Sequence, residues 1–295
     1  DSIYHMMGSR AKMHKDVVTR FAPSPTGRLH LGHAWSAMLA HDFARSHTGR
    51  FLLRIEDIDT SRCRPEHVEA IFEDLRWLGL DWDGEVMVQS QRMPAYATAM
   101  AALEAKGLLY RCICTRADIA AAASAPQGPM GALYPGTCRQ RAVDADTALP
   151  WSWRLDTAAA LAMTGPLAWE DEAKGRIDAN PALLGDAILA RKDAGTSYHL
   201  SVVVDDAAQG VTDVVRGRDL FAATHLHRLL QALLGLPSPR YHHHRLVVGS
   251  DGERLAKRKS APTLAALRAS GVDPAELVEN MRQARFPVGF ALQEE

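Results

Sequence analysis

Two histidines, His30 and His33, lie three positions apart where an apolar run gives way to a run with helical spacing. The apolar run covers 17–21 and the helical run covers 34–45, so we predict a strand, a tight turn and a helix whose first turn carries both histidines. The free N–H groups and partial positive charge of a helix N-terminus favour a bound phosphate. Gly32 adds no side chain there and would let a flat base approach. The pattern predicts a nucleotide site, although a helix can also begin with two histidines that have no function.

The segment before the histidines is more specific than the four residues from His30 to His33 alone. It reads Arg20-Phe-Ala-Pro-Ser-Pro-Thr-Gly27, and its prolines and glycine impose an irregular turn. Segment and histidines together resemble the HIGH signature of class I aminoacyl-tRNA synthetases, in the form typical of the glutamyl branch. The resemblance implies that His30 and His33 are catalytic residues that contact the phosphates of ATP, with Gly32 in the same ATP site, and that they help to stabilise the transition state of amino-acid activation.

Composition narrows the classes of protein that this chain can represent. The 295 residues carry 34 basic and 35 acidic side chains, for a net charge of −1, which is not the profile of a protein that coats nucleic acid through bulk charge. No apolar run approaches the roughly 18 residues of a membrane span, and we expect no membrane association. Four cysteines are too few for a disulfide scaffold, so we expect a cytoplasmic protein. We also expect a monomer. Residues 1–15 show little apolar periodicity and are interpreted as a leader or an expression remnant.

Strand-like and helix-like runs alternate along the first part of the chain. After the signature helix we predict a strand at 49–55 and helices at 65–78 and 93–106. This alternation predicts an α/β fold with a parallel sheet and crossover helices, which gathers its ligands at the carboxyl ends of the strands. Further elements are expected as strands at 187–190, 198–204, 211–215 and 245–248, and a helix at 220–234. The resemblance implies that this fold is the Rossmann-type class I catalytic domain.

The expected organisation has five parts. They are a leader (1–15), the first half of the catalytic nucleotide-binding domain (16–109), a zinc-binding insertion (110–163), the second half of the catalytic domain (164–248), and a basic loop with a short helical C-terminal part (249–295).

Three cysteines in the expected insertion are candidates for metal ligands. Cys112 and Cys114 are separated by one residue, and Cys138 follows a segment rich in glycine and proline. Three thiolates suit tetrahedral zinc, but spacing alone leaves inert buried cysteines as an equal alternative. The resemblance implies a Cys-x-Cys…Tyr-x-x-x-Cys site, in which Tyr134 completes the ligands of one structural zinc ion per chain. The run at 242–244 is interpreted as histidines of a surface or loop, and not as a metal site.

Two charged residues at strand ends suit an amino-acid substrate with two carboxylates and one ammonium group. Arg20 ends the first strand and Glu56 follows the second, and an arginine can pair with a carboxylate through two hydrogen bonds. In an unrelated protein both could be ordinary surface charges. The resemblance implies that L-glutamate is bound by eight residues: Arg20, Phe21, Ala22, Pro23, Ser24, Glu56, Tyr198 and Arg216.

A second phosphate element is expected in the basic segment Arg254-Leu-Ala-Lys-Arg258. It resembles the KMSKS loop, with Arg254 in place of the first lysine and Ala256 in place of the serine. The resemblance implies that Lys257 is catalytic and binds ATP, since a lysine there offsets the charge that develops on the departing pyrophosphate. ATP would enter with Mg²⁺. The alternative is a solvated basic loop, and the same alternative holds for the basic residues at 216–218.

The acceptor of the activated glutamate is inferred from length and resemblance. Only 38 residues follow Lys257, fewer than the roughly 50 of an independent domain, so we expect no separate anticodon-binding domain. The short form with the tyrosine-containing zinc pattern resembles the branch that transfers glutamate to the queuosine base of tRNA(Asp). The alternatives are a catalytic fragment that charges tRNA(Glu) at its 3′ end and an inactive paralogue that binds tRNA.

Overall fold

The computed structural model describes residues 16–121, 127–255 and 261–294. The strands are β1 (Val18–Phe21), β2 (Arg50–Ile55), β3 (Met87–Val88), β4 (Leu109–Cys112), β5 (Gln127–Gly128), β6 (Gly131–Ala132), β7 (Ser152–Leu155), β8 (Ala168–Asp171), β9 (Gly175–Asp178), β10 (Ile188–Ala190), β11 (Asp213–Gly217), β12 (Arg240–His244), β13 (Val247–Gly249) and β14 (Phe290–Leu292). The α-helices are α1 (Leu31–Ser46), α2 (Pro65–Trp77), α3 (Met93–Ala105), α4 (Arg116–Ala121), α5 (Thr137–Arg141), α6 (Thr157–Thr164), α7 (Tyr198–Ala208), α8 (Ala223–Leu234), α9 (Leu264–Ala269) and α10 (Pro274–Arg282). Three short 3-10 helices are η1 (Gln89–Gln91), η2 (Pro181–Leu184) and η3 (Arg218–Leu220).

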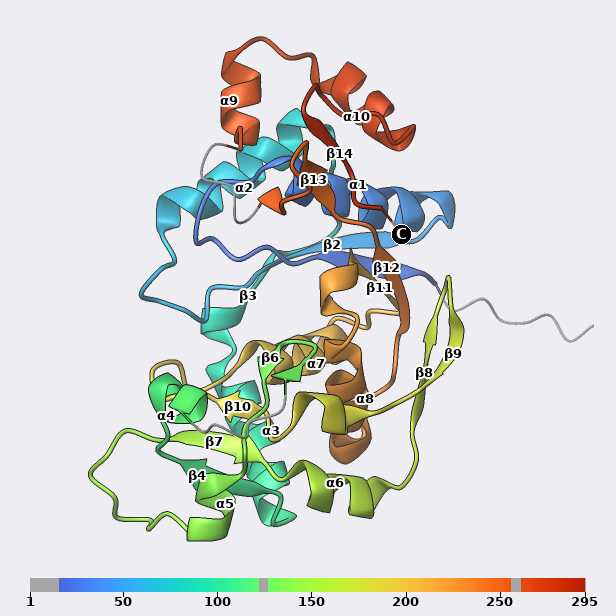
Figure 1. The fold of residues 1–295 in the computed structure, drawn as a ribbon. Coiled ribbons are helices and arrows are strands. Elements are labelled where there is room, and N and C mark those ends of the chain that lie inside the picture. The colour runs from blue at the N-terminus through green and yellow to red at the C-terminus, as the bar shows by residue number, and fades with distance from the viewer. Residues whose placement is uncertain (1–15, 122–126, 256–260, 295) are drawn as a thin grey trace, which may run out of the picture.

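Parallel strands form the middle layer of the molecule (Figure 1). β1 pairs with β2 and β2 with β3, while β11 pairs with β12 and β12 with β8, all in parallel. The two groups meet where the backbone N–H of Thr212 donates to the carbonyl of Val18 at 3.0 Å. Antiparallel β9 extends the layer beyond β8. The prediction of an α/β fold with a parallel sheet is confirmed, and the carboxyl ends of β1, β2 and β11 face the same edge.

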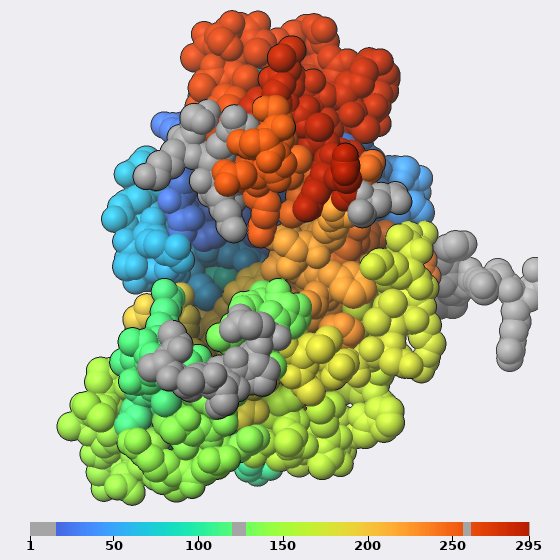
Figure 2. Space-filling model, in the orientation of Figure 1, coloured from blue at the N-terminus to red at the C-terminus, as the bar shows by residue number. Residues whose placement is uncertain are grey.

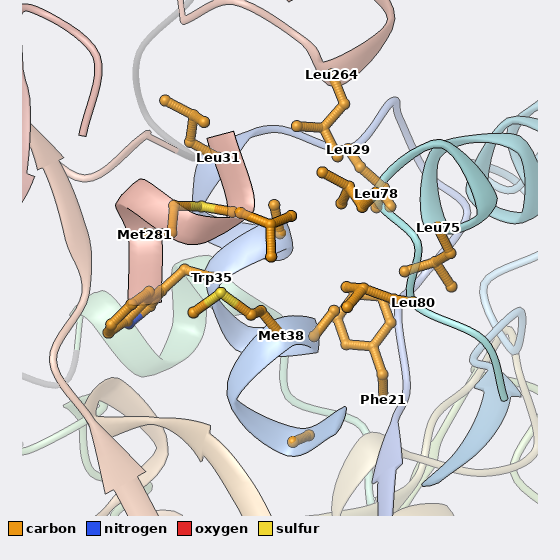
Figure 3. Packing of buried hydrophobic residues seen from close by; sticks show 14 of the residues in the cluster. Phe21, Leu29, Leu31, Trp35, Met38, Leu75, Leu78, Leu80, Leu264 and Met281 are labelled. Atoms are coloured by element: carbon orange, nitrogen blue, oxygen red, sulfur yellow. The ribbon is translucent and has the colours of Figure 1, made fainter. Parts of the chain in front are cut away.

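Helix α1 forms the centre of the main hydrophobic core (Figure 3). Its Leu31, Trp35 and Met38 are buried between the sheet and the C-terminal helices, and Met281 of α10 belongs to the same cluster. Leu264 of α9 joins that cluster as well and is fully buried. The short C-terminal helices therefore pack on the nucleotide half of the fold and help to close its core.

A second lobe lies at the other end of the molecule from α9 and α10 (Figures 1 and 2). Antiparallel β4, β7 and β10 form a small sheet in this lobe. A separate core, built by α3, α7, α8 and part of this sheet, connects the lobe to the parallel layer. The segment that was expected to be an insertion, 110–163, contains most of β4 and all of β7.

Two of the expected strands differ in the structure. The run at 198–204 is not a strand but the start of helix α7. Its valines favour a strand locally, but Ser197 caps the helix by accepting a hydrogen bond from the Leu200 N–H, and packing on several sides buries the apolar residues. The strand expected at 245–248 is displaced, because β12 ends at His244 and β13 begins at Val247.

Other expectations agree with the structure or lie outside it. The predicted signature helix is confirmed and begins earlier, at Leu31. The leader expected at 1–15 lies outside the described residues. In the described ranges no helix combines the length and the hydropathy that a bilayer crossing requires.

Asp205 connects helix α7 to the segment formed by η1 and the start of α3. The carboxylate has no exposed surface and accepts hydrogen bonds from Gln89 (2.9 Å), Arg92 (2.6 Å) and Tyr96 (2.6 Å), which lie on η1 and α3 or between them. A buried carboxylate with three donors fixes the position of α7, because its loss would leave a guanidinium and two polar groups without a partner.

We expect Asp205→Ala to lower the free energy of unfolding by about 3–5 kcal/mol, because one partner of a buried ion pair is removed. Urea unfolding monitored by circular dichroism measures this. Glu172→Ala is the control, since its pair with Arg240 is more than half exposed on both sides and should contribute about 1 kcal/mol or less. Equal losses in the two variants would contradict the assigned role of Asp205.

Candidate active site and metal centre

A cavity of about 380 Å³ opens at the carboxyl edge of the parallel strands, beside the first turn of α1. Ten of the residues singled out in the sequence line it: Arg20, Phe21, Ala22, Pro23, Ser24, Gly32, His33, Glu56, Tyr198 and Arg216. A smaller cavity of about 180 Å³ adjoins it and contains His30. The two cavities share Gly32, His33, Ser36, Gly217 and Asp219, so together they form one elongated site.

His30 and His33 cap the helix on which they stand. The Nδ1 atom of His30 accepts a hydrogen bond from the Gly32 N–H at 3.1 Å, and Nδ1 of His33 accepts from the His30 N–H at 3.0 Å. Burial lowers the pKa of His30 to about 4 and that of His33 to about 3, the latter helped by its neighbour His30. Both rings are therefore neutral at pH 7, and because Nδ1 accepts, each carries its proton on Nε2. The site thus offers two N–H donors beside a helix N-terminus.

Gly32 makes room for the His30 ring. A Cβ at position 32 would lie 3.0 Å from Cε1 of His30 and 3.2 Å from its Nδ1. The ring centroids of His30 and His33 are only 3.8 Å apart, so the first ring has little space to move away. The glycine was expected to admit a base, and the structure adds that it first admits the capping histidine.

Arg20 is held by a carboxylate that sequence reasoning did not identify. Its Nε lies 2.9 Å from Oδ1 of Asp206 and its Nη2 lies 3.3 Å from Oδ2, so the pair has two hydrogen bonds. Arg54, which has no exposed surface, binds the same carboxylate. Burial lowers the pKa of Arg20, but Asp206 more than offsets this and raises it. Arg20 is therefore partly neutralised, with only its remaining N–H groups free for a ligand.

The carboxyl group of Glu56 lies in an environment that disfavours its charged form. Its Oε1 atom is buried without a hydrogen-bond partner among the described residues, and Nε of Arg54 approaches it only to 3.6 Å. Burial raises the pKa of Glu56 to about 7, against the lowering effect of Arg54 and Arg20. Such a group favours any ligand that brings a positive charge or an N–H donor.

Arg216 is buried, so the interpretation of 216–218 as a solvated surface is wrong for this residue. Its Nη1 donates to the hydroxyl of Tyr198 at 3.2 Å, and both side chains line the cavity. Arg216 is the last residue but one of β11, and Tyr198 begins α7. The predicted pairing of these two positions in one site is therefore seen, although Tyr198 arrives on a helix and not on a strand.

Lys257 and Ala256 lie outside the described residues. The chain on either side of them is attached to the site. Before the gap, Leu255 is buried beside the smaller cavity and Arg254 pairs with Asp219. After the gap, Thr263 forms an antiparallel bridge with His30.

The cysteine cluster lies in the second lobe, away from this cavity. The sulfur atoms of Cys112, Cys114 and Cys138 all lie within 4.8 Å of one another, and Cys114 and Cys138 are 3.5 Å apart. The hydroxyl of Tyr134 lies 3.5 Å from the Cys114 sulfur and accepts a hydrogen bond from the Cys138 N–H at 2.7 Å. A tetrahedral zinc ion places two sulfur ligands about 3.8 Å apart and a sulfur and an oxygen about 3.5 Å apart. The four groups therefore fit a metal site.

The guanidinium of Arg154 lies over the Tyr134 ring, 3.7 Å from its centroid, and donates to the Asp186 carbonyl. This stacking fixes the ring that carries the fourth candidate ligand.

The histidines at 242–244 lie on β12 and not in a loop, which corrects the sequence interpretation. They have three different carboxylate or hydroxyl partners: His242 with Asp213, His243 with Asp171, and His244 with Ser36. Their alternation along the strand sends neighbours to opposite faces.

Three residues of the site were not identified from the sequence: Arg54, Asp206 and His243. Asp206 had a usable signal, because an acidic pair closes the apolar run at 202–204. The expected strand ended at 204, so the prediction left Asp205 and Asp206 outside any regular element, whereas both lie on helix α7. His227 lies on the helix expected at 220–234, and the structure turns it into the site, where it is 3.3 Å from Arg216.

Comparison with known proteins gives one consistent result. Residues 16–291 match the model for tRNA synthetases class I (E and Q), catalytic domain. The chain is 52% identical to a Glutamyl-Q tRNA(Asp) synthetase of Rhodobacter capsulatus over 275 residues, which cover 88% of this chain and 98% of the relative. It is 44% identical to the protein of the same name from Symbiobacterium thermophilum, over 89% of this chain and 84% of the relative.

Among solved structures, a glutamate tRNA ligase from Elizabethkingia meningosepticum in complex with its amino acid superposes with a TM-score of 0.73 at 26% identity. The match covers 90% of this chain and 60% of that structure's chain.

The raised pKa of Glu56 predicts a pH-dependent cost in stability. A carboxyl group that titrates near 7 in the fold and near 4.5 in the unfolded chain favours the fold in its protonated form, so stability falls as the pH rises through this range. We expect the gain in stability from Glu56→Gln to grow by about 1 kcal/mol between about pH 6 and about pH 8.

Urea unfolding of both proteins at the two pH values measures this difference. Glu172→Gln, at an exposed carboxyl group, should show no such trend. A gain that is constant or shrinks with rising pH would mean that Glu56 titrates in its ordinary range.

Proposed function

Because the chain belongs to the class I tRNA synthetases for glutamate and glutamine, we propose that it activates L-glutamate with ATP and transfers the glutamyl group to queuosine in tRNA(Asp). The assignment of queuosine as the acceptor rests on the relatives, which share the name Glutamyl-Q tRNA(Asp) synthetase at 42–52% identity. The match covers 98% of the relative from Rhodobacter capsulatus. The observation that supports glutamate as substrate is the charge of the cavity.

The charges of the cavity complement those of glutamate. Arg20 pairs with Asp206, and Arg54 lies close to both Asp206 and Glu56, whereas Arg216 forms no ion pair among the described residues. These five groups carry one net positive charge when Glu56 is ionised. Asp219 also lines the cavity, but its charge is paired with that of Arg254. Glutamate carries one net negative charge at neutral pH. We assign its ammonium group to Glu56 and its carboxylates to Arg216 and to the free edge of Arg20, with Tyr198 and the backbone from Phe21 to Ser24 enclosing the substrate.

Activation joins a carboxylate oxygen of glutamate to the α-phosphorus of ATP and releases pyrophosphate. We assign the Nε2–H groups of His30 and His33 to the phosphate oxygens, where they would stabilise charge that develops in the transition state. The free N–H groups at the start of α1 act on the same side. We assign Mg²⁺ to the entering ATP, and we assign to Lys257 the catalytic role that the resemblance to the KMSKS loop implies.

Transfer then forms an ester. A hydroxyl oxygen of queuosine attacks the carbonyl carbon of glutamyl-adenylate, AMP leaves with the electrons of the broken C–O bond, and the hydroxyl proton passes to the departing phosphate or to water. A catalytic fragment that charges tRNA(Glu) would use the same adenylate but the 3′-terminal adenosine as nucleophile. An inactive paralogue would form no adenylate.

Glutamate transfer distinguishes these possibilities. We expect glutamate-dependent ATP–pyrophosphate exchange without tRNA, and transfer of labelled glutamate to tRNA(Asp) only when the tRNA carries queuosine. Enzymatic trimming of the 3′-terminal adenosine should leave this transfer intact, because the trimmed tRNA loses only the ordinary acceptor. Trimming is preferable to periodate oxidation, since queuosine also holds a diol that periodate would attack.

Transfer that disappears after trimming, or that proceeds equally well on tRNA(Asp) without queuosine, would favour the fragment that charges tRNA(Glu). Absence of exchange in a folded protein would favour the inactive paralogue.

For the metal centre we propose one structural zinc ion, held by Cys112, Cys114, Tyr134 and Cys138. The thiol-rich set favours zinc over magnesium or calcium, which prefer oxygen ligands. The ion would join the end of β4 to α5 and thereby stabilise the second lobe, without contact with the reacting groups.

We expect elemental analysis of the purified protein to give about one zinc per chain. Cys112→Ser should lower this content and loosen the second lobe, because metal binding contributes to folding there. Cys63→Ser is the matched control, since Cys63 lies outside the cluster. A zinc content that Cys112→Ser and Cys138→Ser leave unchanged would contradict the assignment.

A further inference from the structure

Arg216 has an environment unlike that of the other buried arginines of the site. Five acceptors surround its guanidinium: the Tyr198 hydroxyl (3.2 Å), His227 Nδ1 (3.3 Å), the Leu220 carbonyl (3.3 Å), Thr224 Oγ1 (2.7 Å) and His243 Nε2 (3.3 Å). All five are uncharged. Among the described residues no carboxylate forms an ion pair with Arg216, whereas Arg20 and Arg54 share Asp206.

A buried guanidinium without a carboxylate is costly. Arg216 is only 5% exposed, and removing an ion from water is normally offset by an opposite charge. Here the direct contacts are hydrogen bonds to neutral acceptors, and Asp206 acts on Arg216 only without contact, so the guanidinium has no carboxylate bound to it. The five acceptors use all five N–H groups of the guanidinium, so a carboxylate that enters the cavity would meet its positive charge and share or replace a neutral acceptor such as the Tyr198 hydroxyl.

The hydrogen bonds to Arg216 determine the tautomers of His227 and His243, since a guanidinium can only donate. His243 must accept at Nε2, so its Nδ1 carries the proton and donates to Oδ2 of Asp171 at 2.8 Å. His227 must accept at Nδ1, so its Nε2 carries the proton and donates to Nδ1 of His199 at 3.1 Å.

The histidines are also kept neutral. Burial lowers the pKa of His243 to about 3, with a further lowering by Arg216 that outweighs the raising effect of Asp171. Burial and Arg216 lower the pKa of His227 as well, and that of His199 to about 4. The acceptors around Arg216 therefore stay uncharged throughout the neutral range.

We infer that His227 and His243, with Thr224, are positioning residues that hold Arg216 by neutral acceptors only and so reserve its charge for a carboxylate of the substrate. The inference rests on the proposed function, in which Arg216 binds glutamate. It goes further because it gives these three side chains a defined role: they fix the position of the Arg216 guanidinium and add no negative charge next to it. Asp171 supports this role from behind His243, too far from the guanidinium to form an ion pair with it.

The test compares variants that differ only in charge. Asn at position 227 can place an acceptor where Nδ1 of His227 lies, and Asp has the same shape with a negative charge. We expect the KM for glutamate in ATP–pyrophosphate exchange to be at least about tenfold higher for His227→Asp than for His227→Asn, because the new carboxylate neutralises Arg216. The KM for ATP should differ between the two by less than about twofold, since the phosphates bind at the other end of the site.

A second pair, Thr224→Asp and Thr224→Asn, approaches the guanidinium from α8 through a different hydrogen bond and should show the same split. Urea midpoints establish that the compared proteins are folded, and if the His227 pair does not fold, the Thr224 pair decides. Equal KM values for glutamate within a folded pair would overturn the inference.

Arg216→Met separates this inference from its premise. If that variant binds glutamate as well as the parent protein does, the assignment of Arg216 to the substrate is wrong and the premise fails. If Arg216→Met raises the KM for glutamate while the Asp and Asn variants agree with each other, the proposed function stands and only the neutral-acceptor inference is lost.

Discussion

The carboxylate of Asp206 holds together the parts of the site that come from different elements. It receives Arg20 from β1 and Arg54 from β2, while it stands on α7, which belongs to the second core. Three buried charges in contact cannot be separated without leaving ions unpaired in a poorly solvated interior. The next residue toward the N-terminus, Asp205, is bound in the same way to Arg92 and Tyr96. Helix α7 is therefore fixed on two sides, and Tyr198 at its start is fixed with it.

This frame lets the cavity keep two groups in unfavourable states. Glu56 is buried with one oxygen that has no hydrogen-bond partner among the described residues, and Arg216 is buried with neutral acceptors. A ligand group of opposite charge would stabilise each of these two side chains. The site therefore favours a ligand that carries both a positive and a negative group, at a cost in the stability of the free protein. The paired charges of Asp206 give the rigidity that such a site requires, since otherwise Arg216 could move to a carboxylate of the protein.

The nucleotide end of the site follows a different principle, in which the interactions that begin a helix also orient the donors. His30 and His33 use Nδ1 to satisfy backbone N–H groups at the start of α1, and this leaves Nε2–H on each ring. The capping hydrogen bonds thus select the tautomer, and burial keeps the rings neutral. Gly32 belongs to this arrangement because a side chain there would meet the His30 ring.

The sequence by itself determined the features that depend on local order. The strand, turn and helix around His30 and His33 and the α/β class could be predicted, because each rests on spacing within short segments. The spacing of the cysteines left a metal site and inert thiols as equal alternatives, and the resemblance to a family added Tyr134. The sequence also predicted that Arg20, Glu56, Tyr198 and Arg216 share a site, which came from the resemblance to a family. The tertiary structure decided what those residues face. Only packing made 198–204 a helix, brought Asp206 to Arg20 and Arg54, and surrounded Arg216 with His227 and His243. These contacts join residues that are far apart in the chain, and whether a buried charge is neutralised depends on which partners the fold brings within hydrogen-bonding distance.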